Sequence, residues 1–158
     1  MPKITPFLWF DDNAEEAVNL YVSIFKNSKI NSVSRYGSAG PGELGKVMTI
    51  SFELNGLSLI ALNGGPIYKF TEAISLEVDC ESQEEVDELW DRLLADGGEP
   101  SQCGWLKDKF GLSWQIVPTA MMELIQGPDP AGSQRAMAAM LKMSKLDLAI
   151  LRQAYEQQ

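Results

Sequence analysis

The sequence predicts an α+β fold in which a strand–helix–strand–strand–strand unit occurs twice and is followed by a helical tail. Two helix-start motifs, Asn13-x-x-Glu16 and Ser82-x-x-Glu85, have sequence positions that differ by 69. Each motif follows one strand pattern and precedes further strand patterns that end in a hairpin. A chain of 158 residues suits one domain that contains both copies.

The first repeat begins with an apolar and aromatic run over residues 4–10, which predicts a strand. Asn13 and Glu16 then fit an N-cap and its reciprocal partner, and apolar residues at helical spacing predict a helix as far as Phe25. Residues 30–36 predict the second strand of this repeat.

The hairpin of the first repeat has the clearest local pattern in the chain. Apolar and polar residues alternate over residues 47–54, and a second apolar run covers residues 57–62. The Asn55-Gly56 pair between them is typical of a type I′ turn, because both central residues need positive φ.

The second repeat shows the same order of patterns. Residues 71–79 predict a strand, and Ser82 with Glu85 forms a second capping box. Strands are predicted over residues 102–106 and 112–117. An apolar stripe at helical spacing predicts the helix between the strands over residues 71–79 and 102–106, and its members are Val86, Leu89, Trp90, Leu93 and Leu94.

The two repeats differ in length. The positions of the hairpin glycines Gly56 and Gly111 differ by only 55, against 69 for the helix starts, so the first repeat is longer by 14 between helix and hairpin. We assign most of this excess to the glycine-rich stretch Gly37–Gly45. It is either a plain surface insertion or a lid over a site.

The tail has the pattern of short amphipathic helices. One is expected over residues 119–126, a second after Asp129-Pro130, and a last one after a third capping box, Ser144-x-x-Asp147. Methionine-rich apolar faces adapt to many partners. They favour a subunit contact or a pocket cover over a peptide-binding groove.

These patterns give the expected domain boundaries. The paired domain covers residues 1–118, with its repeats at about 3–65 and 70–118, and the helical extension covers residues 119–158. We expect this extension to pack on the domain or on a partner subunit.

Composition excludes several classes of function. The net charge of −9 argues against binding to nucleic acid or to an anionic membrane surface. No apolar run approaches the length of a membrane-spanning helix, the first residues lack a signal pattern, and two cysteines are too few for a disulfide framework. The cytoplasm is therefore the expected location. Eleven carboxylates lie between Glu72 and Glu99, either as solvated helix and strand surface or as a cation-attracting surface.

Three segments resemble one known family: Trp9–Ala17, Ala61–Pro66 and Cys103–Pro118. They are similar to the PhnB-like branch of the vicinal oxygen chelate superfamily, also named 3-demethylubiquinone-9 3-methyltransferase, and Lys145-Leu146-Asp147 extends the resemblance into the tail. The resemblance implies the glyoxalase/bleomycin resistance fold, a curled eight-stranded mixed sheet around a cleft. It also implies a homodimer.

The resemblance raises the question of a metal, because enzymes of the superfamily hold a divalent ion with His and Glu side chains. This chain has no histidine. Gln115 stands where related enzymes place a ligand Glu, and Ile67 stands where members of the branch carry His. We therefore expect no metal and no other cofactor. A magnesium or manganese site made of strand carboxylates stays open, with candidates Glu53, Glu72 and Glu77.

Other chemistry has few candidates. A methyltransferase of the Rossmann type needs a glycine-rich turn after a first parallel strand, and no such pattern occurs here. Cys103 is the one plausible nucleophile, because Lys107 and Lys109 nearby could lower its pKa. The alternative is that Cys103 is a small buried residue at a strand start. Cys80 is expected in the core.

Four residues are predicted to bind a ligand: Trp9, Asn63, Trp105 and Gln115. Gln115 in an apolar cleft would orient a ligand through hydrogen bonds. Trp9 and Trp105 lie on predicted strands and either line the pocket or belong to the core, whereas Trp114 is expected in the core.

We therefore expect the protein to bind a small, partly apolar molecule in its cleft without a histidine-ligated metal, as bleomycin-resistance proteins of the superfamily bind without chemistry. The alternative is a lyase- or isomerase-type enzyme that uses weakly bound magnesium or manganese, or Cys103. A third possibility is a structural or regulatory partner that makes contact through its tail helices.

Overall fold

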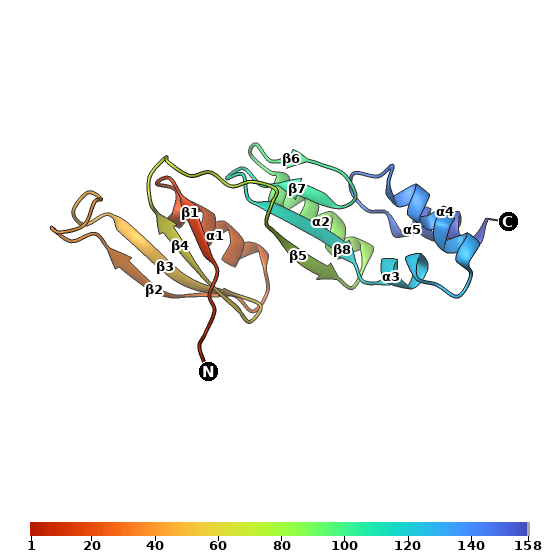
Figure 1. Cartoon of the computed structure of the whole chain (residues 1–158), viewed down its shortest axis with the longest axis horizontal. Helices are drawn as coiled ribbons and strands as arrows, with labels where there is room; N and C mark the ends of the chain where they lie inside the picture. The colour runs from red at the N-terminus through yellow and green to blue at the C-terminus, as the bar shows by residue number, and fades with distance from the viewer. Residues whose placement is uncertain (158) are drawn as a thin grey trace. The chain divides into compact units, whose positions relative to one another are not determined.

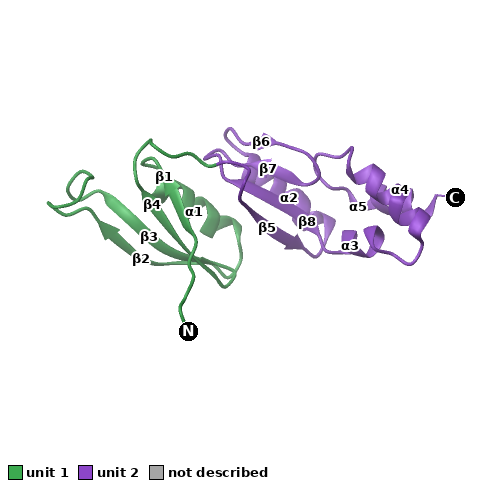
Figure 2. Ribbon diagram, in the orientation of Figure 1, with its two compact units in different colours: residues 1–70 green, residues 71–158 purple. Residues whose placement is uncertain are grey.

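The computed structural model describes residues 1–157, and the chain divides into two compact units (Figure 2). Unit 1 covers residues 1–70, and unit 2 begins at residue 71. Each unit contains one strand–helix–strand–strand–strand repeat, and unit 2 also contains the helical tail (Figure 1).

Unit 1 is a four-stranded mixed sheet with one helix packed on it. Its elements are β1 (Phe7–Phe10), α1 (Ala14–Ile24), β2 (Lys29–Arg35), β3 (Val47–Leu54) and β4 (Leu57–Asn63). The strand order is β1-β4-β3-β2, with β1 parallel to β4 and the other pairs antiparallel.

Unit 2 repeats this topology and adds three helices. Its elements are β5 (Ser75–Cys80), α2 (Gln83–Leu94), β6 (Glu99–Pro100), β7 (Trp105–Lys107), β8 (Ser113–Pro118), α3 (Ala120–Ile125), α4 (Pro130–Met140) and α5 (Leu148–Glu156). The strand order is β5-β8-β7-β6. The predicted α+β fold class with two βαβββ units and a helical tail is confirmed, and the eight strands form two separate four-stranded sheets.

The helix of each unit buries one apolar stripe against its sheet. In α1 the buried positions follow helical spacing, and in α2 Val86, Trp90 and Leu93 do the same. In β8, Trp114 and Ile116 are 1% and 0% exposed, as expected for strand residues that face the helix. The prediction that Trp114 lies in the core is confirmed.

The two hairpins are built in different ways. Asn55 and Gly56 have φ of 44° and 89°, which agrees with the predicted type I′ turn. In unit 2 the turn is organised around the buried carboxylate of Asp108. This carboxylate accepts hydrogen bonds from the Phe110 N–H at 2.9 Å, the Leu112 N–H at 3.1 Å and Trp114 Nε1 at 2.9 Å.

The first helix is capped by a residue that sequence spacing did not indicate. Asn13 has φ −110° and ψ 22°, not the extended conformation of an N-cap, and its side chain caps nothing. Asn63 Oδ1, at the end of β4, accepts the Ala14 N–H at 2.9 Å instead. In unit 2 the prediction holds, because Ser82 Oγ accepts the Glu85 N–H at 3.2 Å.

The caps of the tail helices agree with the prediction in one of two places. Asp129 Oδ1 accepts the Ala131 N–H at 3.1 Å, as expected for Asp129-Pro130. The capping box assigned to Ser144 is wrong, because α5 begins later and Asp147 is its N-cap, accepting the Ile150 N–H at 3.1 Å. The Ser144 hydroxyl donates instead to the Ser101 carbonyl.

The tail forms part of the core of unit 2. Leu146 and Leu151 are 0% exposed and pack in one cluster with Val117 and Met121. Gln83 of α2 joins the tail with both ends of its amide: Nε2 donates to the Leu146 carbonyl and Oε1 accepts the Leu148 N–H, each at 2.9 Å.

Several strand predictions need correction, and the strand expected over residues 71–79 begins only at Ser75. The strand expected over residues 102–106 is shifted, because Cys103 and Gly104 turn with φ of 56° and 85° and β7 begins at Trp105. β6 was missed because it has two residues. The connection between β2 and β3 covers residues 36–46, whereas that between β6 and β7 covers residues 101–104, so unit 1 is longer in this loop and in its strands.

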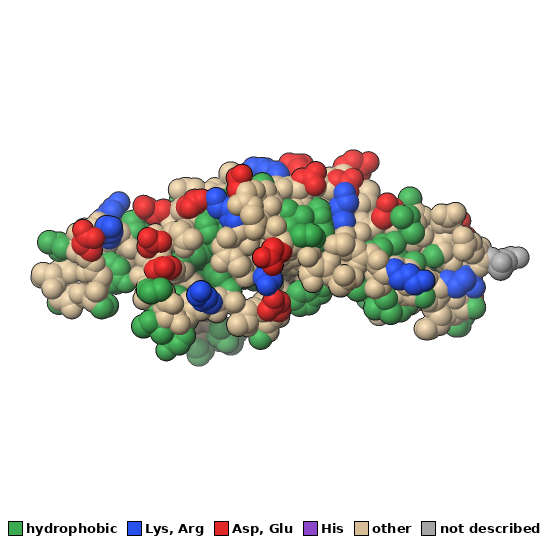
Figure 3. Space-filling view, turned by 90° about the horizontal axis from the view of Figure 1, so that it is seen from above, with side chains coloured by type: hydrophobic (Ala, Val, Ile, Leu, Met, Phe, Trp, Pro, Cys, Tyr) green, Lys and Arg blue, Asp and Glu red, His purple; other side chains and the backbone are tan. Residues whose placement is uncertain are grey.

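Acidic and basic side chains are interspersed on the face of the molecule shown in Figure 3. Within residues 1–157, none of the helices has the length and apolar character needed to cross a membrane.

Candidate ligand-binding pocket

Unit 2 contains a pocket of about 460 Å³, here called the unit 2 pocket. It lies on the side of the sheet opposite α2. Along β8, Trp114 and Ile116 face the core, whereas the alternate residues Gln115 and Val117 face the pocket. The lining residues are Glu77, Asp79, Cys103, Trp105, Gln115, Val117, Thr119, Met121, Met122 and Met140.

Strand register brings two of the predicted ligand-binding residues together. Trp105 of β7 lies directly opposite Gln115 of β8 in the antiparallel ladder. Residues that are directly opposite in such a ladder have neighbouring side chains on the same face. Trp105 and Gln115 therefore form a continuous wall of the unit 2 pocket.

The two side chains of this wall carry one unpaired hydrogen-bond acceptor and one unpaired donor. Gln115 Nε2 donates to Ser75 Oγ at 2.9 Å. Among the described residues, Gln115 Oε1 and the indole N–H of Trp105 have no hydrogen-bond partner. A ligand in the pocket can therefore donate to one group and accept from the other.

The tail supplies apolar side chains to the lining of the pocket. Met121 and Met122 come from α3 and Met140 comes from the end of α4. Thioether side chains are flexible and polarizable, and they make favourable contacts with aromatic rings. The sequence pattern left open whether these helices cover a pocket or form a subunit contact, and in this structure three of their methionines line the pocket.

Cys103 also lines this pocket, but it is held in a structural turn. Its N–H donates to the Met143 carbonyl at 2.9 Å, and its thiol donates to the Met140 carbonyl at 3.5 Å. Lys107, one of the two lysines that could have lowered its pKa, pairs with Glu72 at 2.8 Å and with Glu99 at 3.7 Å. The hydrogen bond to Glu72 is the main cause that raises the pKa of Lys107.

The other cysteine is buried as predicted. Cys80 is 1% exposed at the end of β5. Burial, with smaller contributions from Glu85 and Asp79, raises its pKa to about 11. The thiol is therefore protonated and poorly nucleophilic at neutral pH.

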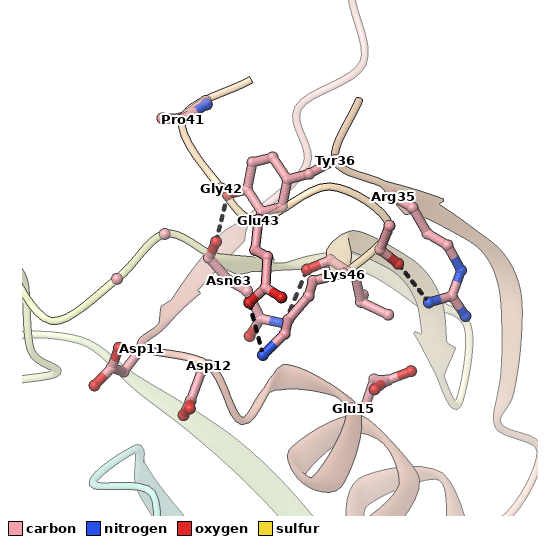
Figure 4. A pocket seen from close by; sticks show the side chains of 14 residues that line it. Asp11, Asp12, Glu15, Arg35, Tyr36, Pro41, Gly42, Glu43, Lys46 and Asn63 are labelled. Carbon is pink, nitrogen blue, oxygen red and sulfur yellow. Dashed lines mark hydrogen bonds and ion pairs between the residues drawn. The ribbon is translucent and has the colours of Figure 1, made fainter. Parts of the chain in front are cut away.

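Asn63 lies in a different pocket, of about 490 Å³, in unit 1. Figure 4 shows this unit 1 pocket between the segment that carries Asp12 and leads into α1, where Glu15 lies, and the loop that carries Glu43 and Lys46. Glu43 and Lys46 pair at 3.2 Å. Asn63 has structural partners on both ends of its amide, because it caps α1 and its Nδ2 donates to the Val47 carbonyl at 3.1 Å.

Tyr36 anchors the glycine-rich loop of the unit 1 pocket. Its hydroxyl donates to the Asn63 carbonyl at 2.6 Å, and its ring is buried. A Cβ on Gly42 would overlap the Tyr36 ring, so the loop can wrap this ring closely because Gly42 has no side chain. The stretch expected as an insertion or a lid is thus folded around a buried tyrosine.

Trp9 lines neither of these two pockets. Its indole N–H donates to the Gly65 carbonyl at 2.8 Å, and its ring meets Tyr68 edge-on at 4.9 Å. Gly64 lies against the same ring, where a Cβ would overlap it. These contacts give Trp9 a packing role at the end of β4.

The side chains present do not fit a histidine–glutamate metal centre. The chain has no histidine, and the amide of Gln115 is a neutral, weak ligand. Glu53 pairs with Lys29 at 3.6 Å and Glu72 pairs with Lys107, whereas Glu77 lines the unit 2 pocket. Across residues 1–157, His, Cys, Asp and Glu side chains form no group of three that could hold a metal ion.

Comparison of this chain with known proteins shows the family to which it is similar. A family model described as 3-demethylubiquinone-9 3-methyltransferase matches residues 2–117. The match ends before the tail, so Met121, Met122 and Met140 lie outside it. No curated protein sequence matches the chain.

One solved structure supports the same assignment, and two others show a similar fold. A PhnB protein from Bacillus cereus, described as a 3-demethylubiquinone-9 3-methyltransferase, is 40% identical, with a TM-score of 0.68 over 75% of this chain and 100% of its own. A protein from Pseudomonas aeruginosa is 20% identical, with a TM-score of 0.60 over 73% of this chain and 96% of its own. The fosfomycin resistance protein FosX from Listeria monocytogenes is 19% identical, with a TM-score of 0.54 over 77% of this chain and 94% of its own. The last two similarities concern the fold alone.

Proposed function

The chain belongs to the family described as 3-demethylubiquinone-9 3-methyltransferase, a PhnB-like family of the vicinal oxygen chelate superfamily, and from this premise we propose that its unit 2 pocket binds a small, partly apolar molecule without a histidine-ligated metal. The observation that carries the proposal is the wall formed by Trp105 and Gln115, which face each other in the ladder and line one pocket.

The shape and lining of the pocket support binding of a compact molecule. A volume of about 460 Å³ lies within the usual range of small-molecule sites, roughly 300–1,000 Å³. Apolar side chains from Trp105, Val117 and the methionines supply contact area, whereas the amide of Gln115 supplies orientation. This division between apolar walls and a few polar groups is typical of ligand sites.

The reaction in the family description is not part of this proposal. Adenosylmethionine-binding Rossmann domains bind their nucleotide at a glycine-rich turn of a parallel sheet. Both sheets of this chain are four-stranded and mixed, and the glycine-rich segment before β3 is wrapped around Tyr36. The architecture therefore gives no support to methyl transfer of that type.

Fluorescence titration with N-phenyl-1-naphthylamine, a neutral aromatic probe, tests the proposal. Binding should raise the probe's emission with saturation. Trp105→Ala should weaken binding roughly tenfold or more, because it removes the aromatic contact area of one wall. Gln115→Ala should weaken it about threefold to tenfold, the value of one hydrogen bond.

Lys46→Ala, in the unit 1 pocket, is the matched control and should leave the probe affinity unchanged. Equal losses in Trp105→Ala and Lys46→Ala would contradict the assignment of the site. Metal analysis of protein purified without chelators is the second test. If the protein holds a transition metal tightly and in stoichiometric amount, the proposal that it binds its ligand without such a metal is wrong.

A second candidate is an enzyme of the lyase or isomerase type that uses Cys103, and it is favoured by the position of Cys103 in the pocket lining. Its expected signature is consumption of a compound from a metabolite extract by the unmodified protein but not by Cys103→Ser, measured by mass spectrometry. Equal consumption by both proteins would exclude Cys103 as the nucleophile. Loss of turnover on chelation would indicate weakly held magnesium or manganese.

We also propose that the protein is a homodimer, as the family resemblance implies. β2 lies at an edge of the unit 1 sheet and exposes Ile30 and Val33 at 40% and 45%. Exposed apolar strand edges need a cover. Light scattering should therefore give twice the chain mass of 17.5 kDa, and a monomer mass at micromolar concentration would contradict the proposal.

A further inference from the structure

We propose that the unit 2 pocket selects organic cations, which are molecules with a protonated amine on an apolar body, and that Glu77 and Asp79 hold the amine. This inference deepens the proposed function and rests on it. Neither carboxylate was predicted as a ligand-binding residue, although Glu77 was considered as a metal ligand.

The fold places both carboxylates on the pocket side of the sheet. Glu77 and Asp79 are two residues apart on β5, so their side chains point to the same face. In the parallel ladder Glu77 lies opposite Gln115 and Asp79 lies opposite Val117, and all four residues line the pocket. The acidic strand is therefore adjacent to the wall made by Gln115.

Among the described residues, both carboxylates lack a counter-charge, in contrast to several other acidic residues of unit 2. Glu72 and Glu99 pair with Lys107, and Asp87 pairs with Lys145 at 2.7 Å. Within the described part of the chain, no ion pair or hydrogen bond involves the carboxylate of Glu77 or Asp79. The pocket lining contains no lysine or arginine. A cation in the pocket would therefore meet negative charge that no protein group neutralises.

The remaining lining suits the rest of such a molecule. The face of the Trp105 indole ring can attract a cation, and the apolar surface of the ring can pack against the apolar body of the ligand. The three methionines of the tail offer an adaptable apolar surface. A protonated amine would also find an acceptor in Gln115 Oε1. Carboxylate, indole and thioether groups together favour a ligand that is charged at one end and apolar at the other.

The expected selectivity is moderate, because Glu77 and Asp79 are solvent-exposed. One or two exposed ion pairs should favour a cation over a neutral molecule of the same shape by about threefold to tenfold. The net charge of −9 acts in the same direction at low ionic strength. An anion of the same shape should bind more weakly than either.

Three probes of one shape test the inference: 4-phenylbutylamine as the cation, 4-phenylbutanol as the neutral molecule and 4-phenylbutyrate as the anion. Their affinities are measured at pH 7 by calorimetric titration of the full chain. The predicted order is amine, then alcohol, then carboxylate. Sodium chloride at high concentration should reduce the preference for the amine, because it screens exposed charges.

Two isosteric variants assign the effect to residues. Glu77→Gln and Asp79→Asn together should remove the preference for the cation, so that 4-phenylbutylamine and 4-phenylbutanol bind the double variant with equal affinity. Asp91→Asn, an exposed carboxylate on α2 outside the pocket, is the matched control and should change neither affinity.

The outcomes separate this inference from the proposed function. Equal affinities of amine and alcohol for the unmodified protein would overturn the cation selectivity and leave ligand binding intact. A loss in Asp91→Asn of half the loss in the double variant or more would also overturn it, because one charge removed outside the pocket would then count as much as one removed inside it. Absence of binding by all three probes would contradict the proposed function and the inference together.

Discussion

Unit 1 and unit 2 share one topology but complete it with different parts of the chain. In unit 1 the connection between β2 and β3 is long and folds around Tyr36. In unit 2 the equivalent connection is short, and its residues Cys103 and Gly104 donate their N–H groups to the carbonyls of Met143 and Ser144 in the tail. The β2–β3 connection of unit 1 therefore packs on its own residues, whereas the β6–β7 connection of unit 2 is held by the tail, which is distant in the sequence.

This difference explains why the two pockets have different character. The unit 1 pocket is bounded by a polar loop whose charged residues Glu43 and Lys46 neutralise each other. The unit 2 pocket is bounded by methionines from a segment that the family model does not match. The proposed ligand specificity of the unit 2 pocket would therefore depend on the tail as well as on the shared repeat.

The largest expected effect concerns the hairpin of unit 2. Asp108→Ala should lower the free energy of unfolding by about 3–5 kcal/mol, because three N–H donors lose a charged acceptor in a buried site. Urea denaturation measures this change. Asp91→Ala, at an exposed position of α2, should stay within about 0.5 kcal/mol. Similar effects of the two variants would show that the Asp108 network does not stabilise the fold.

Two glycines with nearly the same φ test the docking of the tail. Gly104 and Gly56 have φ of 85° and 89°, but a Cβ on Gly104 would lie 2.8 Å from Leu146 Cδ1 and 2.9 Å from the Ile116 carbonyl oxygen. Gly104→Ala should therefore cost about 2–4 kcal/mol, and Gly56→Ala about 1 kcal/mol from backbone strain alone. Thermal or urea unfolding compares them, and equal costs would contradict close packing of the tail on β7.

Gln83 gives a more specific test of the same contact. Gln83→Ala removes two hydrogen bonds to the tail and should destabilise unit 2 by roughly 1–3 kcal/mol. Hydrogen exchange should rise in α5, whereas α1 should keep its protection. Asn19→Ala, at an exposed position of α1, serves as the control. Unchanged exchange in α5 would mean that these bonds do not hold the tail.

The smallest expected effect is a pH dependence of the tail contact. The ion pair with Lys145, followed by the hydrogen bond from Gln83, lowers the pKa of Asp87 below its ordinary value of 3.8. The carboxylate therefore stabilises the folded state above that value, and this stabilisation is lost as the pH falls through the lowered pKa. Because the pair is partly exposed, its contribution should be at most about 1 kcal/mol.

Asp87→Asn should remove this part of the acid sensitivity. Urea denaturation at pH 7 and at pH 3 measures the difference between the variant and the unmodified protein. The two proteins should differ more at pH 7 than at pH 3. A larger difference at pH 3 would contradict the sign of the shift.

The sequence predicted those structural elements whose patterns depend only on residues that are neighbours in the chain. The alternation over residues 47–54 and the Asn55-Gly56 turn depend on neighbouring residues, and both are confirmed. The cap of α1 was missed because the capping oxygen belongs to Asn63, which is distant in the chain and reaches Ala14 only after β4 has paired with β1. β6 gave no signal because two residues cannot show a period.

The candidate site, like the fold, was predictable only where a local pattern indicated it. Alternation along β8 put Gln115 on the face opposite Trp114, and the structure adds Trp105 beside it. Glu77 and Asp79 could not be assigned to the same wall, because they reach it through parallel pairing of β5 with β8, which is absent from any local pattern. Asn63 and Trp9 lie elsewhere, where packing and capping account for their contacts.

The most direct test of the central claim, that the unit 2 pocket binds the ligand, is a proton–nitrogen NMR titration of the four tryptophan indole N–H signals. With N-phenyl-1-naphthylamine as the probe, the signal of Trp105 should shift with saturation, because Trp105 lines the pocket and its indole N–H has no protein partner among the described residues. The signal of Trp9, which is bonded to the Gly65 carbonyl, should stay in place. A saturable shift of Trp9 with an unmoved Trp105 would contradict the account.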